Sequence, residues 1–305
     1  MNGYINLSNS HRTSEIKPRV TYFITGSSGF LGSNFKTILG NNGLILTCPL
    51  RENIASELKN VSQLELLIHC AGKAHSTKVS FKEEKAFFDS NVELTKRLTS
   101  IISENAIRVN TFVFISTVAV YGIEEGNQIT EEFPLNGQSV YACSKILAEE
   151  HLVQWSKNQD VNLVILRLPL IFGDNAPGNL GAMEKAIKGR YYFQIGTGSA
   201  RRSMIHVKQL AEFIPNLIGK SGIYNLTDGY HPTYAEVANR FGKLHGRRIK
   251  SLSLDIIRPI ARIGDLLPKF PLNSYRLSKL NQTLTFNDQK ARKELGWKGS
   301  NALEI

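Results

Sequence analysis

The sequence has few cysteines, no long apolar run and no excess of acidic residues. Its three cysteines, Cys48, Cys70 and Cys143, are far apart and form no CxxC pair, which argues against a disulfide framework and against a zinc site. No apolar run reaches the roughly 18 residues that a membrane span needs, and residues 1–19 lack the apolar core of a secretory signal. We therefore expect a cytoplasmic protein that binds no metal.

The charge of the chain is basic and unevenly distributed. Its 37 Lys and Arg residues exceed its 26 Asp and Glu residues, and the net charge is +11. From Lys243 to Ile305 there are 13 basic and 5 acidic residues, a net +8. Such a region can meet nucleic acid, an anionic membrane or a phosphorylated substrate. Its basic residues are dispersed among apolar ones without an aromatic stripe, so we do not expect nucleic acid as a partner.

Short apolar runs alternate with stretches of helical periodicity from Val20 onward. The composition, with 42% hydrophobic residues, is ordinary for a globular protein. This alternation predicts an α/β protein with a Rossmann-type, doubly wound parallel sheet and helices on both of its faces. The expected strands are 20–25, 44–50, 64–72, 111–122 and 162–173, and the expected helices are 33–40, 87–106 and 141–158.

The pattern divides the chain into three parts. Residues 1–19 are polar and without periodicity, and we interpret them as a flexible tail. Residues 20–173 carry the alternation and predict a dinucleotide-binding domain. After 173, glycine and proline interrupt the rhythm, and residues 174–305 predict a smaller, mixed α/β substrate-binding region. We expect some segments to cross over between these two parts.

A glycine-rich loop lies between the first expected strand and the first expected helix. In Gly26-Ser-Ser-Gly29-Phe-Leu-Gly32, the first glycine permits a tight turn, the second lets a pyrophosphate approach the backbone, and the third lets the helix pack closely. The helix N-terminus also favours phosphate. The spacing alone is weak evidence, but its position after a buried strand predicts a dinucleotide site.

Hydroxyl and ammonium groups form a second candidate site. Tyr141 and Lys145 are four residues apart in an expected helix, which places them on one helix face. A nearby ammonium favours the phenolate form of tyrosine, so the pair can exchange a proton with an alcohol or a carbonyl. Ser116 and Thr117 end an expected strand, where a hydroxyl group can bond the same oxygen as Tyr141 or cap the following turn.

Together these motifs resemble the extended short-chain dehydrogenase/reductase superfamily, in its nucleotide-sugar epimerase, dehydratase and reductase branch. The resemblance extends from about residue 20 to the C-terminus. It rests on the order and spacing of the GxxGxxG loop, IHCAG, DSNV, STVAVYG, YACSK, LRLPLIFG, ARRSMIHV and KARKELGW.

The resemblance implies a role for each matching residue. Tyr141 is expected to be the acid/base, with Lys145 lowering its pKa and holding the nicotinamide ribose. Thr117 falls on the position of the active-site hydroxyl group, with Ser116 beside it, and Asn91 falls on an asparagine that supports the active-site backbone. The implied cofactor contacts are Gly26, Ser28, Gly29, Phe30, Leu31, Gly32, Ala71, Gly72 and Pro169, and the implied substrate contacts are Arg202, at a pyrophosphate, and Asn179.

Two departures from the family pattern bear on the cofactor and the reaction. NAD-specific members carry an acidic residue at the end of the second strand, where this chain has Leu50 followed by Arg51. An arginine there can pair with a 2′-phosphate, so we favour NADP over NAD. Sugar 4,6-dehydratases carry an acid pair after the active-site threonine. Here those positions are Val118 and Ala119, which cannot protonate a leaving hydroxyl group, so dehydration is disfavoured.

The resemblance implies hydride transfer at carbon 4 of a nucleoside-diphospho-sugar, with UDP as the expected nucleotide. We favour a 4-keto-sugar reductase, because an NADP-type pocket suits a reductant that exchanges at every turnover. The alternatives are a UDP-hexose 4-epimerase and a non-catalytic NADP-binding regulatory protein. The intact set of Tyr141, Lys145 and Thr117 argues against the last.

One basic, apolar segment leaves two interpretations open. Apolar residues recur at helical spacing from Leu254 to Phe270, with Arg258, Arg262 and Lys269 between them. The first interpretation is a helix that packs on the substrate region or forms a homodimer contact. The second is a surface helix in weak contact with an anionic membrane.

Overall fold

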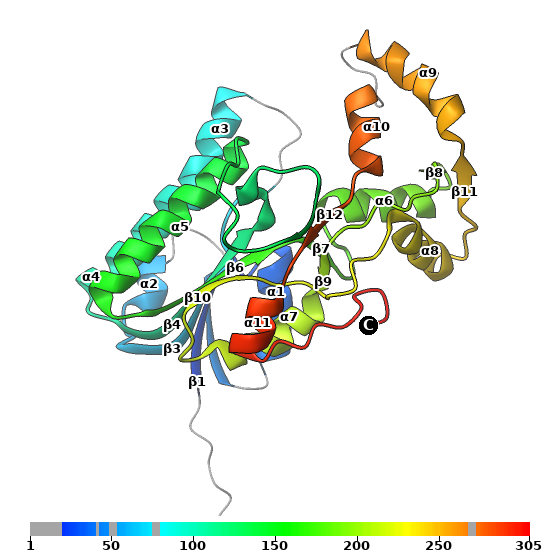
Figure 1. The fold of residues 1–305 in the computed structure, drawn as a ribbon. Coiled ribbons are helices and arrows are strands. Elements are labelled where there is room, and N and C mark those ends of the chain that lie inside the picture. Colours follow the sequence, from blue (N-terminus) through cyan, green and yellow to red (C-terminus); the bar gives the residue numbers. More distant parts are fainter. Residues whose placement is uncertain (1–19, 41–42, 49–53, 75–79, 268–272) are drawn as a thin grey trace, which may run out of the picture.

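The computed structural model describes residues 20–40, 43–48, 54–74, 80–267 and 273–305. A parallel sheet of six strands forms the centre of this part of the molecule, in the order β10-β6-β4-β3-β1-β2 (Figure 1). These strands are β1 (Val20–Thr25), β2 (Gly43–Cys48), β3 (Gln63–His69), β4 (Arg108–Thr117), β6 (Asn162–Leu168) and β10 (Gly222–Asn225).

Helices cover both faces of the sheet because side chains alternate along each strand. Tyr22 and Ile24 of β1 enter one apolar core, while Phe23 between them enters the other. The first core includes side chains of α1 (Phe30–Leu39), α7 (Val207–Phe213) and α11 (Gln289–Leu295). The second includes side chains of α2 (Ile54–Leu58), α4 (Leu94–Glu104) and α5 (Val140–Gln159). This arrangement confirms the predicted doubly wound α/β fold.

The order of the strands reverses at β1. β1 pairs with β2 on one side and with β3 on the other, so Thr25 lies level with both Cys48 and His69. In open α/β sheets, ligands bind outside the carboxyl ends of the strands at such a reversal. The topology therefore places a binding crevice where β1 and β3 end.

Segments from the last third of the chain return to the sheet. β10, α7 and α11 all follow residue 173, yet they belong to the layers of the central sheet. The other late elements form a smaller lobe beside it (Figure 1). They are β7 (Leu170–Phe172), α6 (Gly178–Lys188), β8 (Phe193–Ile195), β9 (Met204–His206), α8 (Tyr234–Leu244), β11 (Lys250–Leu252), α9 (Leu254–Asp265), α10 (Ser274–Asn281) and β12 (Leu284–Phe286), which pairs with β5 (Gly126–Ile129). The short helix η4 (Ile214–Leu217) follows α7 and packs in the first core of the central sheet.

Two of the expected elements are interrupted near the site. The helix expected at 87–106 consists of α3 (Phe81–Phe88), a π-helical turn η2 (Asp89–Glu93) and α4. The strand expected at 111–122 ends at Thr117, where the short helix η3 (Val118–Tyr121) begins. Both irregular turns position site residues, and π-turns are frequent at functional sites.

None of the helices in the described part of the chain combines the length and apolarity that a membrane span requires.

Candidate active site

The glycine-rich loop packs so tightly that side chains would not fit at two of its positions. Gly26 has a φ of +68°, and a Cβ atom there would lie 2.7 Å from Cα of Ala71. A Cβ atom on Gly32 would lie 2.2 Å from the carbonyl oxygen of Gly26. The amide of Gly29 donates to that same oxygen at 3.0 Å. The loop thus brings the start of α1 against the ends of β1 and β3.

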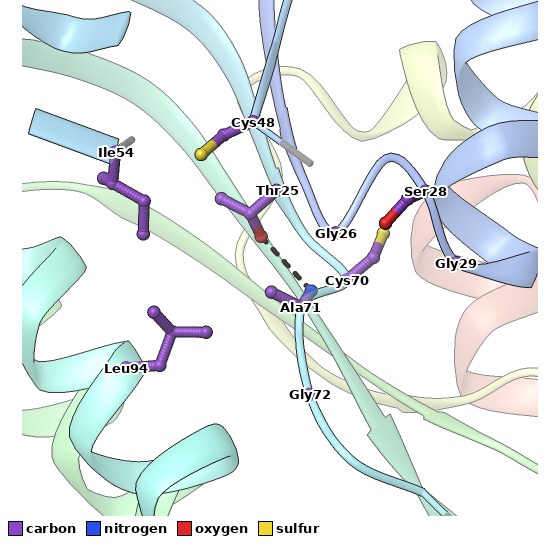
Figure 2. Close-up of a pocket in the computed structure, with 10 residues that line it drawn as sticks. All are labelled: Thr25, Gly26, Ser28, Gly29, Cys48, Ile54, Cys70, Ala71, Gly72 and Leu94. Carbon is purple, nitrogen blue, oxygen red and sulfur yellow. Dashed lines mark hydrogen bonds between the residues drawn. The ribbon is translucent and has the colours of Figure 1, made fainter. Parts of the chain in front are cut away.

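A cavity of about 210 Å³ opens beside this loop, at the strand reversal (Figure 2). The hydroxyl group of Thr25 accepts a hydrogen bond of 3.2 Å from the amide of Ala71, which ties the ends of β1 and β3 together. The residues that line the cavity are Thr25, Gly26, Ser28, Gly29, Cys48, Ile54, Cys70, Ala71, Gly72 and Leu94. Five of the residues expected to contact the cofactor, Gly26, Ser28, Gly29, Ala71 and Gly72, are among them.

Asn91 fixes the backbone that follows β3. Its side chain is buried in η2 and accepts a hydrogen bond from the amide of Lys73 at 2.8 Å. Its amide group donates to the carbonyl oxygen of Lys73 at 3.0 Å and to the hydroxyl group of Ser144 at 2.8 Å. A Cβ atom on Gly72 would lie 2.5 Å from the Asn91 oxygen. Asn91 therefore links the cavity wall to α5, which carries Tyr141 and Lys145.

His69 extends this network and was not predicted as a site residue. Thr25 donates to Nδ1 of the buried imidazole at 2.7 Å, and Nε2 lies 2.9 Å from the hydroxyl oxygen of Thr95. Thr95 donates its own hydrogen to the carbonyl oxygen of Asn91, so His69 must donate from Nε2. Burial lowers the pKa of His69 to about 3, and the positive charge of Lys145 acts in the same direction. Its position at the end of an apolar strand indicated burial but not this network.

Tyr141 and Thr117 meet at the end of β4. A hydrogen bond with Thr117 lowers the pKa of Tyr141, but burial has the larger effect and raises it above its usual value. The family resemblance implied a lowered pKa for this phenol, but the pKa is raised instead, because desolvation disfavours the phenolate. The phenol of Tyr141 is therefore protonated at neutral pH and can donate a proton.

Lys145 lies one helical turn after Tyr141 and is buried. Its Nζ donates to the carbonyl oxygen of Ile115 at 2.9 Å and lies 4.5 Å from the centre of the Phe114 ring. Burial lowers the pKa of Lys145 to about 8, although Cys70 and Glu149 act in the opposite direction. Its ammonium group thus faces the end of β4, and titrates nearer to neutral pH than an ordinary lysine.

Ser116 faces away from Tyr141, although the sequence placed it beside Thr117 as a candidate. Its hydroxyl group donates to the carboxylate of Glu149, which is also buried. Arg167 pairs with the same carboxylate at 2.7 Å and donates to the phenolic oxygen of Tyr121 at 3.2 Å. Consecutive strand residues point to opposite faces, so Thr117 occupies the site while Ser116 holds a buried ion pair.

The remaining candidates lie in different surroundings. Phe30 and Leu31 are the first two residues of α1, and their side chains pack against two different apolar cores. Pro169 joins β6 to β7. Asn179 is exposed in the first turn of α6. Arg51 lies outside the described residues.

Arg202 is bound to the end of α10. Its guanidinium group donates to the carbonyl oxygens of Gln282 and Arg201 through Nη1, and to that of Lys279 at 2.9 Å through Nη2. It also lies 5.4 Å from the centre of the Tyr234 ring. The structure therefore places Arg202 between β9 and α10, with its hydrogen bonds going to backbone oxygens.

The loop, the cavity and the side chains beyond them fit a dinucleotide. Because side chains do not fit at the close-packed glycines, backbone atoms form this part of the cavity wall. Thr117, Tyr141 and Lys145 lie where β4 and α5 meet. Bound there, a nicotinamide would supply hydride chemistry, and the phenol would supply or take up a proton. Within the described ranges, no group of three or more His, Cys, Asp or Glu residues is arranged to hold a metal ion.

The fold and this site define a dinucleotide-binding enzyme of the Rossmann type. The family model described as the NAD dependent epimerase/dehydratase family matches residues 22–226. The chain belongs to this family, which confirms the predicted superfamily, the enzymatic nature of the protein and its use of a nicotinamide cofactor.

The sequence identity to individual relatives is low. The chain is 27% identical to N-acetyl-alpha-D-glucosaminyl-diphospho-ditrans,octacis-undecaprenol 4-epimerase of Escherichia coli O157:H7, over 67% of this chain and 65% of that relative. The UDP-glucose 4-epimerase of Thermotoga maritima, solved with UDP-glucose, superposes with a TM-score of 0.73 at 17% identity, over 93% of this chain and 95% of the other. RMD from Pseudomonas aeruginosa, complexed with NADPH, gives 0.70 at 16% identity, over 93% and 96%.

Proposed function

We propose that the protein transfers a hydride between a nicotinamide cofactor and carbon 4 of the sugar in a nucleoside-diphospho-sugar. The observation that carries this proposal is the meeting of Thr117, Tyr141 and Lys145 next to the glycine-lined cavity. Tyr141 moves the proton, Thr117 orients the sugar oxygen, and Lys145 holds the nicotinamide ribose. Asn91 and Ser116 help to position α5, through their hydrogen bonds to Ser144 and Glu149 of that helix.

The cofactor would lie along the carboxyl edge of the sheet. Gly26, Gly29 and Gly32 support this placement, because their packing keeps side chains away from the pyrophosphate position. We assign further cofactor contacts to Ser28, Phe30, Leu31, Ala71, Gly72 and Pro169. In this scheme residues 20–173 hold the cofactor, while residues 174–305 hold the substrate, with Arg202 at its pyrophosphate and Asn179 at its nucleotide.

Within this reaction class we favour reduction of a 4-keto sugar. Burial raises the pKa of Tyr141 and keeps the phenol protonated, which suits a group that gives a proton to a carbonyl oxygen while carbon 4 receives the hydride. Arg51 supports NADP over NAD from the sequence alone. Val118 and Ala119 occupy η3 directly after Thr117 and offer no acid for a dehydration.

A 4-epimerase is the second candidate. The relatives from Escherichia coli and Thermotoga maritima are both named 4-epimerases, and such an enzyme would use the same residues while keeping its cofactor bound. We further propose that the protein acts in the cytoplasm on UDP-linked sugars. Cys48, Cys70 and Cys143 form no disulfide with one another, which is consistent with a reducing compartment.

Incubation with UDP-hexoses and 4-keto UDP-sugars, with and without added NADPH or NADH, separates these candidates. A reductase consumes one NADPH for each keto sugar converted. Turnover of a UDP-hexose without added cofactor would identify an epimerase instead. If no sugar nucleotide reacts although NADPH binds, the protein is a regulatory binding protein and the proposal fails.

A further inference from the structure

One helix of the smaller lobe presents an apolar face that the described chain does not cover. α9 packs one side, with Ile257 and Ala261, against Leu277 of α10. Another side carries apolar residues with large exposed fractions, which we call the α9 apolar face: Ile256 (59%), Ile260 (39%), Ile263 (56%), Leu266 (81%) and Leu267 (49%). The spacing of 256, 260 and 263 keeps these three residues on one stripe along the helix, and Leu266 and Leu267 directly follow the last helical residue, Asp265. The fold buries one stripe and leaves a second exposed.

The position of α9 makes this stripe accessible. α9 projects from the outer end of the smaller lobe, far from the central sheet (Figure 1). The hydroxyl group of Ser253 accepts from the amide of Asp255 and begins the helix. The helix then continues through Pro259, which is itself exposed. A well-formed helix thus holds the stripe on the outside of the molecule.

Basic residues outnumber acidic ones in the elements that pack together at this face. β11, α9 and α10 contain five basic residues (Lys250, Arg258, Arg262, Arg276 and Lys279) and two acidic ones (Asp255 and Asp265). Lys250, Arg258, Arg262 and Arg276 are exposed. Arg258 lies 3.6 Å from Asp255 in an exposed ion pair, which contributes little and is screened by salt. The surroundings of the stripe are therefore positive.

We propose that the α9 apolar face and the basic residues around it bind the surface of an anionic membrane. An exposed stripe of aliphatic side chains on an amphipathic helix, in a part of the surface with a net positive charge, is the pattern of a helix that lies in the plane of the lipid headgroups. The positive charge selects anionic lipid as the occupant. A protein partner would more often meet aromatic anchors, and the stripe contains none. Binding would hold the active site close to the membrane without any part of the chain crossing it.

Flotation with lipid vesicles tests the proposal, and it needs no turnover, so its result is independent of the proposed reaction. The full chain should float with vesicles of phosphatidylcholine and phosphatidylglycerol at about 0.05 M salt, and should be released at about 0.5 M salt, where screening is strong. It should stay unbound with vesicles of phosphatidylcholine alone. Equal binding to both vesicle types would refute the selection by charge, and no flotation at low salt would refute the proposal as a whole.

Variants assign the binding to α9. The double variant Ile256→Ser and Ile263→Ser should lower the bound fraction at least about tenfold, because apolar burial anchors such a helix. The matched control is Leu44→Ser with Leu147→Ser, whose side chains are similarly exposed (50% and 43%) but lie on β2 and α5. It should bind like the unaltered chain. An equal loss in both variants would refute the assignment, and Arg262→Gln should shift release to lower salt.

A second outcome would also overturn the proposal. If the unaltered chain forms a concentration-dependent dimer that the Ile256→Ser and Ile263→Ser variant abolishes, and if it does not float, the face binds a second copy of the chain. Because both isoleucines are exposed, the variant should keep the melting temperature of the unaltered protein. That measurement separates loss of binding from loss of the fold.

Discussion

Replacement of His69 by phenylalanine tests the buried network that links the cavity to Asn91. Phenylalanine keeps a ring among the neighbouring rings of Phe112 and Phe114, whose centres lie 6.0 and 5.7 Å from that of His69. It removes the acceptor for Thr25 and the donor to Thr95. Both hydroxyl groups are buried, and each buried group left unpaired destabilises by about 1–3 kcal/mol. We expect a total loss of about 2–4 kcal/mol at pH 7, since both groups keep one other partner.

The loss should also depend on pH. The pKa of His69 is about 3 in the folded chain and 6.5 ordinarily, so between these values the unfolded chain binds one proton more than the folded chain does. The stabilisation from this group is complete above the ordinary pKa, and it is lost as the pH falls toward the folded value. Stability should fall by about 1.4 kcal/mol per pH unit through this one group. The His69→Phe variant lacks that contribution.

Urea unfolding of both proteins between pH 5 and pH 8 measures this difference. The gap in unfolding free energy between the unaltered chain and His69→Phe should be constant near pH 8 and should shrink below the ordinary pKa of histidine. Thr95→Val serves as the control, because it breaks the same hydrogen bond to His69 but keeps the titrating group. A gap for His69→Phe that stays constant down to pH 5 would show that the imidazole is not held neutral by burial.

Two further predictions concern the chemistry. Tyr141→Phe keeps the ring but removes the ionisable oxygen, so turnover should fall by at least roughly a hundredfold while cofactor binding is largely kept; near-normal activity in a steady-state assay would contradict the assignment. Arg51→Ala should weaken binding of NADP much more than binding of NAD if the arginine holds a 2′-phosphate, and equal weakening in a fluorescence titration would mean that it does not.

Local patterns were sufficient to predict the framework of the site. The strand at 20–25, the loop from Gly26 to Gly32 and the helix after it are encoded by neighbouring residues, because strand, turn and helix signals act over short distances. The four-residue spacing of Tyr141 and Lys145 is likewise a property of a single helix. These features appear in the structure where the sequence placed them.

Features that depend on packing between distant segments could not be predicted in this way. The family resemblance placed Thr117 on the active-site hydroxyl position, but the hydrogen bond by which Ser116 joins a buried ion pair depends on Glu149 of α5 and could not be predicted. The rise in the pKa of Tyr141 comes from burial by neighbouring elements. The run from Gly222 to Asp228 indicates a strand added to the sheet, but its pairing with β6 joins residues more than fifty positions apart, so the sequence did not show which strand it lies beside.

The backbone around Arg202 bears on how a substrate phosphate would reach it. Nη1 of Arg202 donates to two carbonyl oxygens, and Nη2 donates to the carbonyl oxygen of Lys279 near the end of α10. Within the described part of the chain, Nε makes no hydrogen bond. A guanidinium group binds phosphate best through two parallel donors, and the edge formed by Nε and the second hydrogen of Nη2 provides such a pair. If Arg202 binds the substrate phosphate as proposed, it must therefore use that edge or release its hydrogen bond to the carbonyl oxygen of Lys279.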